Sequence, residues 1–266
     1  MKIVRFFSGG AIHLGEQVSD ASARRIEGDL FGSFRVTDQT LKIQKLLAPL
    51  VPTDILCIGL NYREHAAESK MELPRHPLLF IKASNTLNNP FDPIPVPKLT
   101  HQVDYEGELA VIIGKTARHV SREVALDHVF GYTVANDVSA RDWQREKSLG
   151  GGQFARGKSF DGFCPLGPCI VTADQIPNPN DLHLKTSLNG MVVQDNTTGD
   201  MIFDVPALIA SLSSTMTLRP GAIILTGTPQ GVGMARTPPL WLKSGDVVAV
   251  EIQDIGRLEN PVADEH

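Results

Sequence analysis

The chain has 266 residues, with 25 Lys and Arg, 30 Asp and Glu, and a formal net charge of −5. This length suits one large domain, or a large domain with a small appendage, and 42% apolar with 21% charged residues is typical of a globular protein. Mild acidity without a Lys/Arg-dense block argues against a nucleic-acid partner, and no apolar run approaches the ~20 residues of a membrane span. The N-terminus lacks the apolar core of a signal peptide, and three cysteines without CxxC spacing are typical of reduced thiols, so we expect a cytoplasmic protein.

The predicted strands are short runs rich in Val, Ile, Leu and Phe, bounded by Gly, Pro, Asn or Asp. Asn189-Gly190 predicts a hairpin, because a type I′ turn needs positive φ at both central residues. In chain order the strands are Ile55–Leu60, Leu78–Lys82, Leu109–Ile113, Val129–Ala135, Leu182–Leu188, Ala222–Thr226 and Val247–Ile252.

Fewer segments have a helical pattern. Asp204 as cap and Pro206 in the first turn predict a helix over Ala207–Met216, which ends before Arg219-Pro220-Gly221. Shorter helices are expected over Asn61–Lys70 and Ser139–Lys147, and an irregular proline-rich segment over 85–99.

Helices do not alternate regularly with strands, which disfavours a doubly wound sheet or a (β/α)₈ barrel. We therefore expect a β-rich α+β fold: a mixed β-sandwich or roll with peripheral helices. Residues 1–52, ending at Leu50-Val51-Pro52, are expected to form a small N-terminal domain, and residues 53–266 the main domain.

Two glutamates open the apolar run of the third predicted strand. Glu106 and Glu108 are two residues apart, so in a strand they share one face, with only Gly107 between them. Carboxylates this close repel each other unless a cation or a proton lies between them. Either the pair is a solvated polar strand end, or it forms part of a site for a hard cation.

Asp137 stands where the next predicted strand ends and a polar helix begins. It can cap that helix, which is the commoner role for Asp at such a junction. Alternatively, it supplies a third carboxylate, and three carboxylates with water suit Mg²⁺ or Mn²⁺ better than Zn²⁺.

His65 and Glu68 are three residues apart in a predicted short helix. At this spacing Glu68 can orient the imidazole, as a general base requires. A solvated surface pair is the alternative interpretation.

Two glycine-containing stretches can bind anions. Residues 152–159 match the P-loop pattern, but a charged helical stretch precedes them and a turn-rich stretch follows, so we interpret the match as accidental. Lys158 remains a cation on a Gly-flanked loop. The loop at Thr228 follows a predicted strand and offers N–H groups and a hydroxyl, although an ordinary turn explains it equally well.

Taken together, these stretches resemble the fumarylacetoacetate hydrolase superfamily, in particular its acylpyruvase and 2-hydroxyhepta-2,4-diene-1,7-dioate isomerase-decarboxylase branch. The resemblance implies a β-rich roll with a divalent metal ion, usually Mg²⁺, and a homodimeric assembly. The similar stretches, in chain order, are Cys57–Glu68, Asp104–Lys115, Tyr132–Gln144, Gly157–Pro168 and Leu225–Gly233.

The resemblance also implies roles for individual residues. The E-x-E and N-D-x-S-A-R-D motifs make Glu106, Glu108 and Asp137 the metal ligands. The G-x-N-Y-x-x-H-x-x-E motif makes His65 and Glu68 a catalytic dyad on a lid. Substrate-contacting positions are occupied by Arg141, Gln144, Lys158 and Thr228, and Lys158 is also expected to neutralise developing negative charge.

The expected function is a Mg²⁺-dependent reaction of a 2-oxo or 2,4-dioxo acid, foremost hydrolysis of a C–C bond in an acylpyruvate. Decarboxylation of an oxaloacetate-type acid and keto–enol isomerisation are the alternatives on the same site, because all three reactions pass through an enolate. Leu60 stands where some acylpyruvase-like members carry Arg, so it does not support assignment to one substrate. A P-loop nucleotide hydrolase and a non-catalytic metal-binding dimer are the remaining alternatives.

Overall fold

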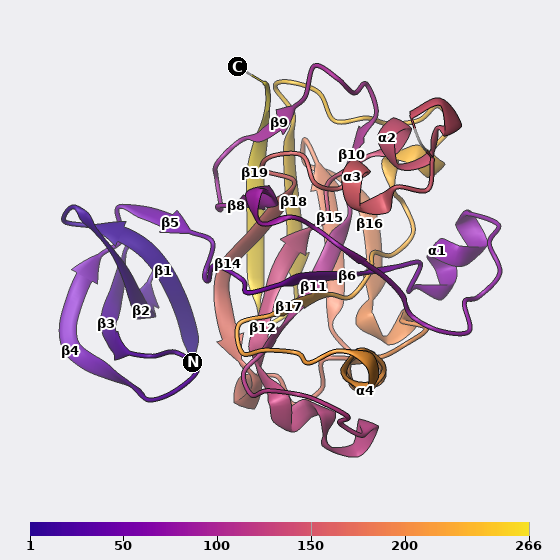
Figure 1. Cartoon of the computed structure of the whole chain (residues 1–266). Helices are drawn as coiled ribbons and strands as arrows, with labels where there is room; N and C mark the ends of the chain where they lie inside the picture. Colours follow the sequence, from indigo (N-terminus) through magenta and orange to yellow (C-terminus); the bar gives the residue numbers. More distant parts are fainter. Residues whose placement is uncertain (150, 266) are drawn as a thin grey trace.

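The computed structural model describes residues 1–149 and 151–265 and consists mainly of strands (Figure 1). Its α-helices are α1 (Arg63–Glu68), α2 (Arg141–Arg145), α3 (Phe154–Gly157) and α4 (Val205–Thr215). Its strands are β1 (Lys2–Ser8), β2 (Ala11–Ser19), β3 (Ser22–Gly28), β4 (Phe34–Lys42), β5 (Lys45–Leu47), β6 (Ile55–Gly59), β7 (Leu78–Ile81), β8 (Leu87–Asn88), β9 (Ile94–Val96), β10 (Val103–Asp104), β11 (Gly107–Ile113), β12 (Val129–Asn136), β13 (Ser139–Ala140), β14 (Cys164–Thr172), β15 (His183–Leu188), β16 (Met191–Thr197), β17 (Ile223–Leu225), β18 (Val247–Ile252) and β19 (Gly256–Asp264).

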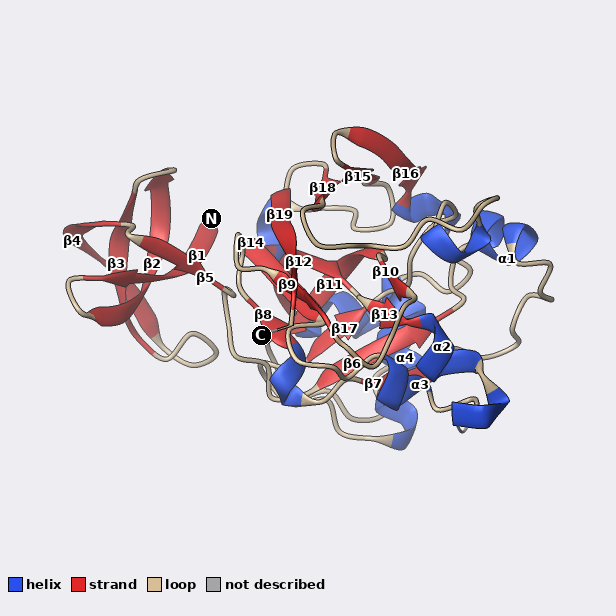
Figure 2. Cartoon of the chain, turned by 90° about the horizontal axis from the view of Figure 1, so that it is seen from above, coloured by secondary structure: helices blue, strands red, loops and turns tan. Residues whose placement is uncertain are grey.

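Most strands belong to one mixed sheet of 12 strands. Its order is β4-β3-β2-β1-β14-β12-β11-β17-β6-β7, with β5 beside β1 and β8 beside β14. A second sheet of five strands has the order β16-β15-β18-β19-β9, and β10 pairs with β13. Helices lie around these sheets (Figure 2), so the predicted β-rich fold class with peripheral helices is confirmed.

The two larger sheets pack face to face over a shared apolar cluster. The side chains of β11 alternate between this cluster and a second one on the opposite face of its sheet. Leu109 and Val111 of β11 share one apolar cluster with Leu184 of β15 and Val250 of β18. Ala110 and the other even-numbered neighbours point to a second cluster on the opposite face of the sheet. Strand β11 is therefore buried along its whole length, which fixes the position of the residues at its N-terminal end.

The N-terminal strands β1–β5 form the indigo part of Figure 1 and join the large sheet through β1. Lys2 lies opposite Val171 of β14 in an antiparallel pair. Ile3 and Ile26 belong to the same buried cluster as Ile170 of β14. Sequence analysis predicted no element in this region, so these strands were missed.

Each of the seven predicted strands is present, with ends displaced by two residues at most. The hairpin is also confirmed: β15 and β16 pair antiparallel, and Asn189 and Gly190 have φ of 52° and 81°. For α4, the Asp204 side chain accepts a hydrogen bond from the Ala207 N–H at 3.0 Å, as expected of a cap.

Three local predictions were wrong in extent. The helix expected from Asn61 to Lys70 spans only Arg63–Glu68, and the helix expected from Ser139 begins at Arg141 because Ser139 and Ala140 pair with β10. The proline-rich segment contains the short strands β8 and β9, which pair at sheet edges where a missing N–H is tolerated. None of the described helices is both long and apolar enough to cross a membrane.

Candidate metal centre and active-site cavity

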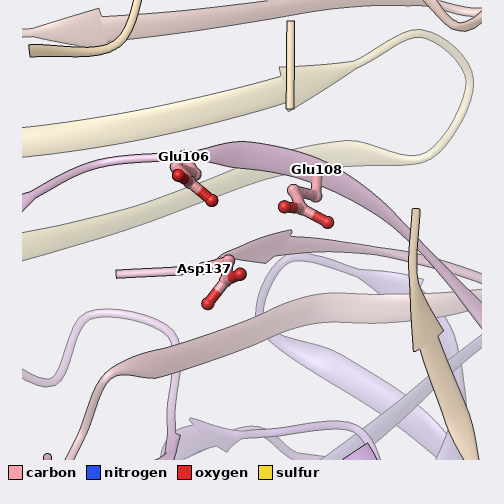
Figure 3. A group of neighbouring side chains, drawn as sticks. All are labelled: Glu106, Glu108 and Asp137. Atoms are coloured by element: carbon pink, nitrogen blue, oxygen red, sulfur yellow. The ribbon is translucent and has the colours of Figure 1, made fainter. Parts of the chain in front are cut away.

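Three carboxylates converge at the N-terminal end of β11 (Figure 3). Glu106, Glu108 and Asp137 are all buried, and one oxygen of each lies within 4.8 Å of one oxygen of the others. The solvated strand end considered for Glu106 and Glu108 is thus ruled out. Three acidic oxygens at this spacing can hold one metal ion.

Pairing of β11 with β12 creates this arrangement. Gly107 lies opposite Asn136, and the Asp137 N–H donates to the Glu106 carbonyl at 2.8 Å. Gly107 is needed between the glutamates because an added Cβ would lie 2.2 Å from Thr186 Oγ1 and 2.9 Å from a Val250 methyl. The local sequence thus brings three like charges together on a rigid sheet.

Asp137 does not cap the following helix. The residue before α2 is Ala140, which makes no side-chain cap, whereas both Asp137 oxygens accept hydrogen bonds from lysines. Lys82 Nζ donates to Oδ1 at 2.5 Å and Lys158 Nζ to Oδ2 at 2.6 Å. Asp137 is therefore held between two buried lysine side chains.

Glu106 also has two cationic partners. Lys158 Nζ donates to its Oε2 at 2.7 Å, and Arg141 Nη2 lies 2.6 Å from its Oε1. Burial raises the pKa of Glu106, but these two cations outweigh that effect and lower the pKa to about 2. Arg141 in turn donates through Nε to Asp104 at 2.8 Å and through Nη1 to Gln144 at 3.1 Å.

Glu108 contacts no cationic side chain among the described ion pairs. Its Oε2 accepts a hydrogen bond from the Gly227 N–H at 2.7 Å. Burial and the neighbouring carboxylates of Asp137 and Glu106 hold the pKa of Glu108 well above its usual value. A divalent cation among the three carboxylates would remove this repulsion, so the donor set fits a metal ion that prefers oxygen ligands.

The loop at Thr228 lies against the same strand. Thr228 Oγ1 donates to the Gly107 carbonyl at 3.0 Å and accepts from Gln194 Nε2 at 2.7 Å. Gln194 Oε1 also accepts from the Gly107 N–H at 2.9 Å, so one buried amide joins β16, β11 and this loop.

His65 and Glu68 lie together on α1, with His65 Nδ1 3.3 Å from Glu68 Oε2. The Gly231 N–H donates to both Glu68 oxygens, at 3.0 and 3.1 Å. Glu68 is thus held in place from the Thr228 loop, and the dyad is not a free surface pair.

A cavity of about 340 Å³ lies beside these groups, although Glu68, Glu108 and Asp137 do not line it themselves. The cavity is lined by six of the predicted site residues: His65, Glu106, Arg141, Gln144, Lys158 and Thr228. Its remaining wall is mostly apolar and includes Ile58, Leu60, Met71, Leu78, Phe80, Phe154 and Met234.

Sequence analysis missed three buried neighbours of the candidate site: Lys82, Asp104 and Gln194. Lys82 is the last residue of a predicted strand. The only sequence feature that could have indicated its place near the site is a lysine at the end of an apolar run. Asp104 and Gln194 act through contacts at sequence distances of 37 and 87 residues, which no local pattern reveals.

The P-loop match is accidental, as expected. In the described residues, α3 is only four residues long, and β14 follows it instead of a phosphate-facing helix. The matching Lys158 is already bonded to Glu106 and Asp137.

The chain belongs to the fumarylacetoacetate hydrolase family. Residues 54–263 match the family model described as "Fumarylacetoacetate (FAA) hydrolase C-terminal", and residues 1–49 match "Rv2993c-like, N-terminal".

Among relatives, the mitochondrial oxaloacetate tautomerase fahd2 of Xenopus laevis is 49% identical over 218 residues, which are 82% of this chain and 68% of the relative. The solved structure of a fumarylacetoacetate hydrolase of Exiguobacterium antarcticum is 40% identical, with a TM-score of 0.86 and complete coverage of both chains. The 2-hydroxyhepta-2,4-diene-1,7-dioate isomerase of Mycobacterium marinum is 37% identical, with a TM-score of 0.85 and coverage of 100% of this chain and 99% of that one.

Proposed function

We propose that this chain catalyses keto–enol tautomerisation of a short 2-oxo acid of the oxaloacetate type, with Mg²⁺ as the first-choice metal ion and Mn²⁺ as the second. One observation carries the proposal: His65 of the histidine–glutamate pair and Glu106 of the carboxylate triad line the same cavity. The relatives named oxaloacetate tautomerases, at 49% and 45% identity in Xenopus laevis and Homo sapiens, support this reaction over the C–C hydrolysis favoured from sequence.

The metal ion would be held by Glu106, Glu108 and Asp137. When bound, it supplies Lewis acidity that polarises the oxo group and stabilises an enolate. The chain's own cations complement it: Arg141 and Lys158 border the same cavity, and Lys158 uses two of its three N–H groups on Glu106 and Asp137. The third N–H is left for a substrate oxygen.

His65 would move the proton. With Nδ1–H donated to Glu68, Nε2 is the basic ring nitrogen, and it makes no hydrogen bond to the described residues. Tautomerisation removes one proton from the carbon beside the oxo group and adds one to the oxo oxygen, so the reaction balances without a second substrate. Gln144 and Thr228 would orient the substrate carboxylate from the cavity wall.

Hydrolysis of an acylpyruvate is the second candidate, and the cavity favours it in one respect. Its volume of about 340 Å³ and its apolar wall leave room beyond a four-carbon acid. In this reaction His65 would take its proton from water instead of carbon.

The test uses the purified chain with Mg²⁺ and three assays. Decay of the ultraviolet absorbance of enol-oxaloacetate reports tautomerisation, and pyruvate release from oxaloacetate or from acetylpyruvate reports decarboxylation or hydrolysis. We expect His65→Ala to lower the tautomerisation kcat by ~10²–10⁴, the usual contribution of a general base, with little change in Mg²⁺ affinity. Tautomerisation no faster than in buffer with Mg²⁺ would overturn the proposal, and acetylpyruvate hydrolysis alone would establish the second candidate.

A further inference from the structure

We propose that Arg145 binds the second carboxylate of the substrate, so that the enzyme selects 2-oxo dicarboxylates over 2-oxo monocarboxylates. This inference rests on the proposed function and names the substrate class of that same site. It assigns a specificity-determining role to a residue that the motifs left without one.

Helix α2 directs three polar side chains at one cavity. Arg141, Gln144 and Arg145 stand at positions i, i+3 and i+4, which share one helix face, and all three line the cavity. With a rise of about 1.5 Å per residue, Arg145 begins about 6 Å further along the helix than Arg141. A ligand whose first carboxylate lies near Arg141 and the metal centre therefore extends toward Arg145.

The cations deeper in the cavity are already neutralised. Arg141 contacts Asp104 and Glu106, and Lys158 contacts Glu106 and Asp137. Arg145 differs, because none of the ion pairs among the described residues includes it. It is an exposed guanidinium at the cavity wall with its charge unmatched.

The hydrogen-bond partner of the Arg145 guanidinium is a weak acceptor. Its Nη1 lies 2.9 Å from the thioether sulfur of Met234, which also lines the cavity. The Met234 N–H donates to Asp104 at 3.0 Å, and Asp104 accepts from Arg141, so this contact links Arg145 to the metal centre. A planar guanidinium offers a carboxylate two parallel hydrogen bonds, which a thioether cannot match.

The experiment compares oxaloacetate with its 4-methyl ester, which has the same carbon skeleton but no distal charge. We expect Arg145→Gln to raise the KM for oxaloacetate by about 10- to 100-fold, the worth of a hydrogen bond to a charged group, with kcat within about twofold. The KM for the ester should not change. Arg145→Lys, which keeps the charge but not the fork, should recover part of the loss.

Arg156→Gln is the matched control. Arg156 is exposed on the neighbouring α3 and stacks on Trp143 with 4.7 Å between its guanidinium carbon and the ring centre, but it does not line this cavity. The substitution Arg156→Gln removes the same charge close to the cavity, and we expect the KM for both substrates to equal the wild-type value. If Arg145→Gln raises the KM for the ester and for oxaloacetate equally, or changes neither KM, the inference is overturned.

Binding separates this inference from the proposed function. Oxalate spans only the metal end, whereas 3,3-difluoro-oxaloacetate reaches the distal end and has no C–H to enolise. Calorimetry with Mg²⁺ should show Arg145→Gln weakening the difluoro compound about tenfold or more and leaving oxalate unchanged. If the wild type shows no tautomerisation but this pattern holds, the reaction is wrong and the role of Arg145 stands. If tautomerisation is present and both affinities are unchanged, the role of Arg145 is wrong.

Discussion

Glu108 differs from the other two carboxylates of the triad in its partners. Glu106 and Asp137 each contact two cationic side chains, whereas Glu108 is bonded to a backbone N–H and faces two anions. Burial and repulsion raise its pKa, so Glu108 is where the metal-free site is electrostatically least satisfied.

Replacing Glu108 therefore separates metal binding from stability. We expect Glu108→Gln to lower Mg²⁺ affinity by about tenfold or more, since even partners of metal ligands contribute about 10–100-fold. Without metal, its melting temperature should stay level or rise, because repulsion ends and the amide oxygen still accepts from Gly227. Calorimetry and thermal unfolding in a chelator measure the two effects, with the exposed Glu72→Gln as control. Unchanged Mg²⁺ affinity would remove Glu108 from the site.

Lys158 has the opposite role in the metal-free protein. Lys158→Met leaves Glu106 and Asp137 without the ammonium that bridges them, and breaking a buried ion pair costs about 3–5 kcal/mol. We expect a lower melting temperature in a chelator and a larger recovery on adding Mg²⁺ than in the wild type. Lys98→Met, at an exposed lysine, should change neither value. A melting temperature equal to the wild type would show that the bridge contributes nothing to folding.

At the scale of elements, the β15–β16 hairpin supports the site through one side chain. Gln194 accepts from Gly107 and donates to Thr228 and to the carbonyl of Pro229. The hairpin thereby fixes both the start of β11 and the loop that borders the cavity.

Gln194→Met keeps the volume but leaves the Gly107 N–H and the Pro229 carbonyl without this partner. Each unsatisfied buried group costs about 1–3 kcal/mol, so we expect destabilisation of that order in chemical denaturation. The kcat/KM should fall as well, because the Thr228 loop loses its anchor. Gln230→Met is a suitable comparison on the same loop, since its amide bonds to the half-buried Asn196 side chain and to the carbonyl of the exposed Asp195. Stability equal to the wild type would contradict the proposed support.

Elements of the main domain could be predicted where local sequence determines them. Strands β11 and β18 each contain at least four consecutive apolar residues, and the Asn189-Gly190 turn determines its own backbone conformation. The N-terminal strands were missed because polar and apolar residues mix in them, as in the Ser22–Gly28 strand. The triad and the dyad followed from spacing and resemblance, and their roles stay predictions. Lys82 and Gln194 could not be found, because tertiary contacts alone bring them to the site.

At the scale of the whole molecule, the N-terminal strands and the main sheet share one core. Ile3 is fully buried in a cluster with Ile170 of β14 and Ile55 of β6, although the family models divide the chain near residue 50. The two sequence regions are therefore expected to unfold together.

Ile3→Ala tests this coupling. Removing a buried isoleucine side chain costs about 2–5 kcal/mol, and we expect the whole chain to lose that stability in a single transition. The circular-dichroism signal and the proposed Mg²⁺-dependent activity should be lost at the same denaturant concentration. Ile12→Ala, at an exposed position of β2, is the control. Two separate transitions would show that the regions fold independently.

The order of strands in the large sheet also determines when the metal site can form during folding. Strand β11 lies between β12 and β17 in the sheet, and more than 100 residues of chain separate β11 from β17. The Gly227 N–H, which donates to Glu108, follows β17 in the chain. Such distant pairings close large loops at an entropic cost, so we expect this one to form late in folding. Mg²⁺ bound at the proposed site should consequently leave the refolding rate nearly unchanged and slow the unfolding rate instead, which would make the ion a source of kinetic persistence and not a template for folding.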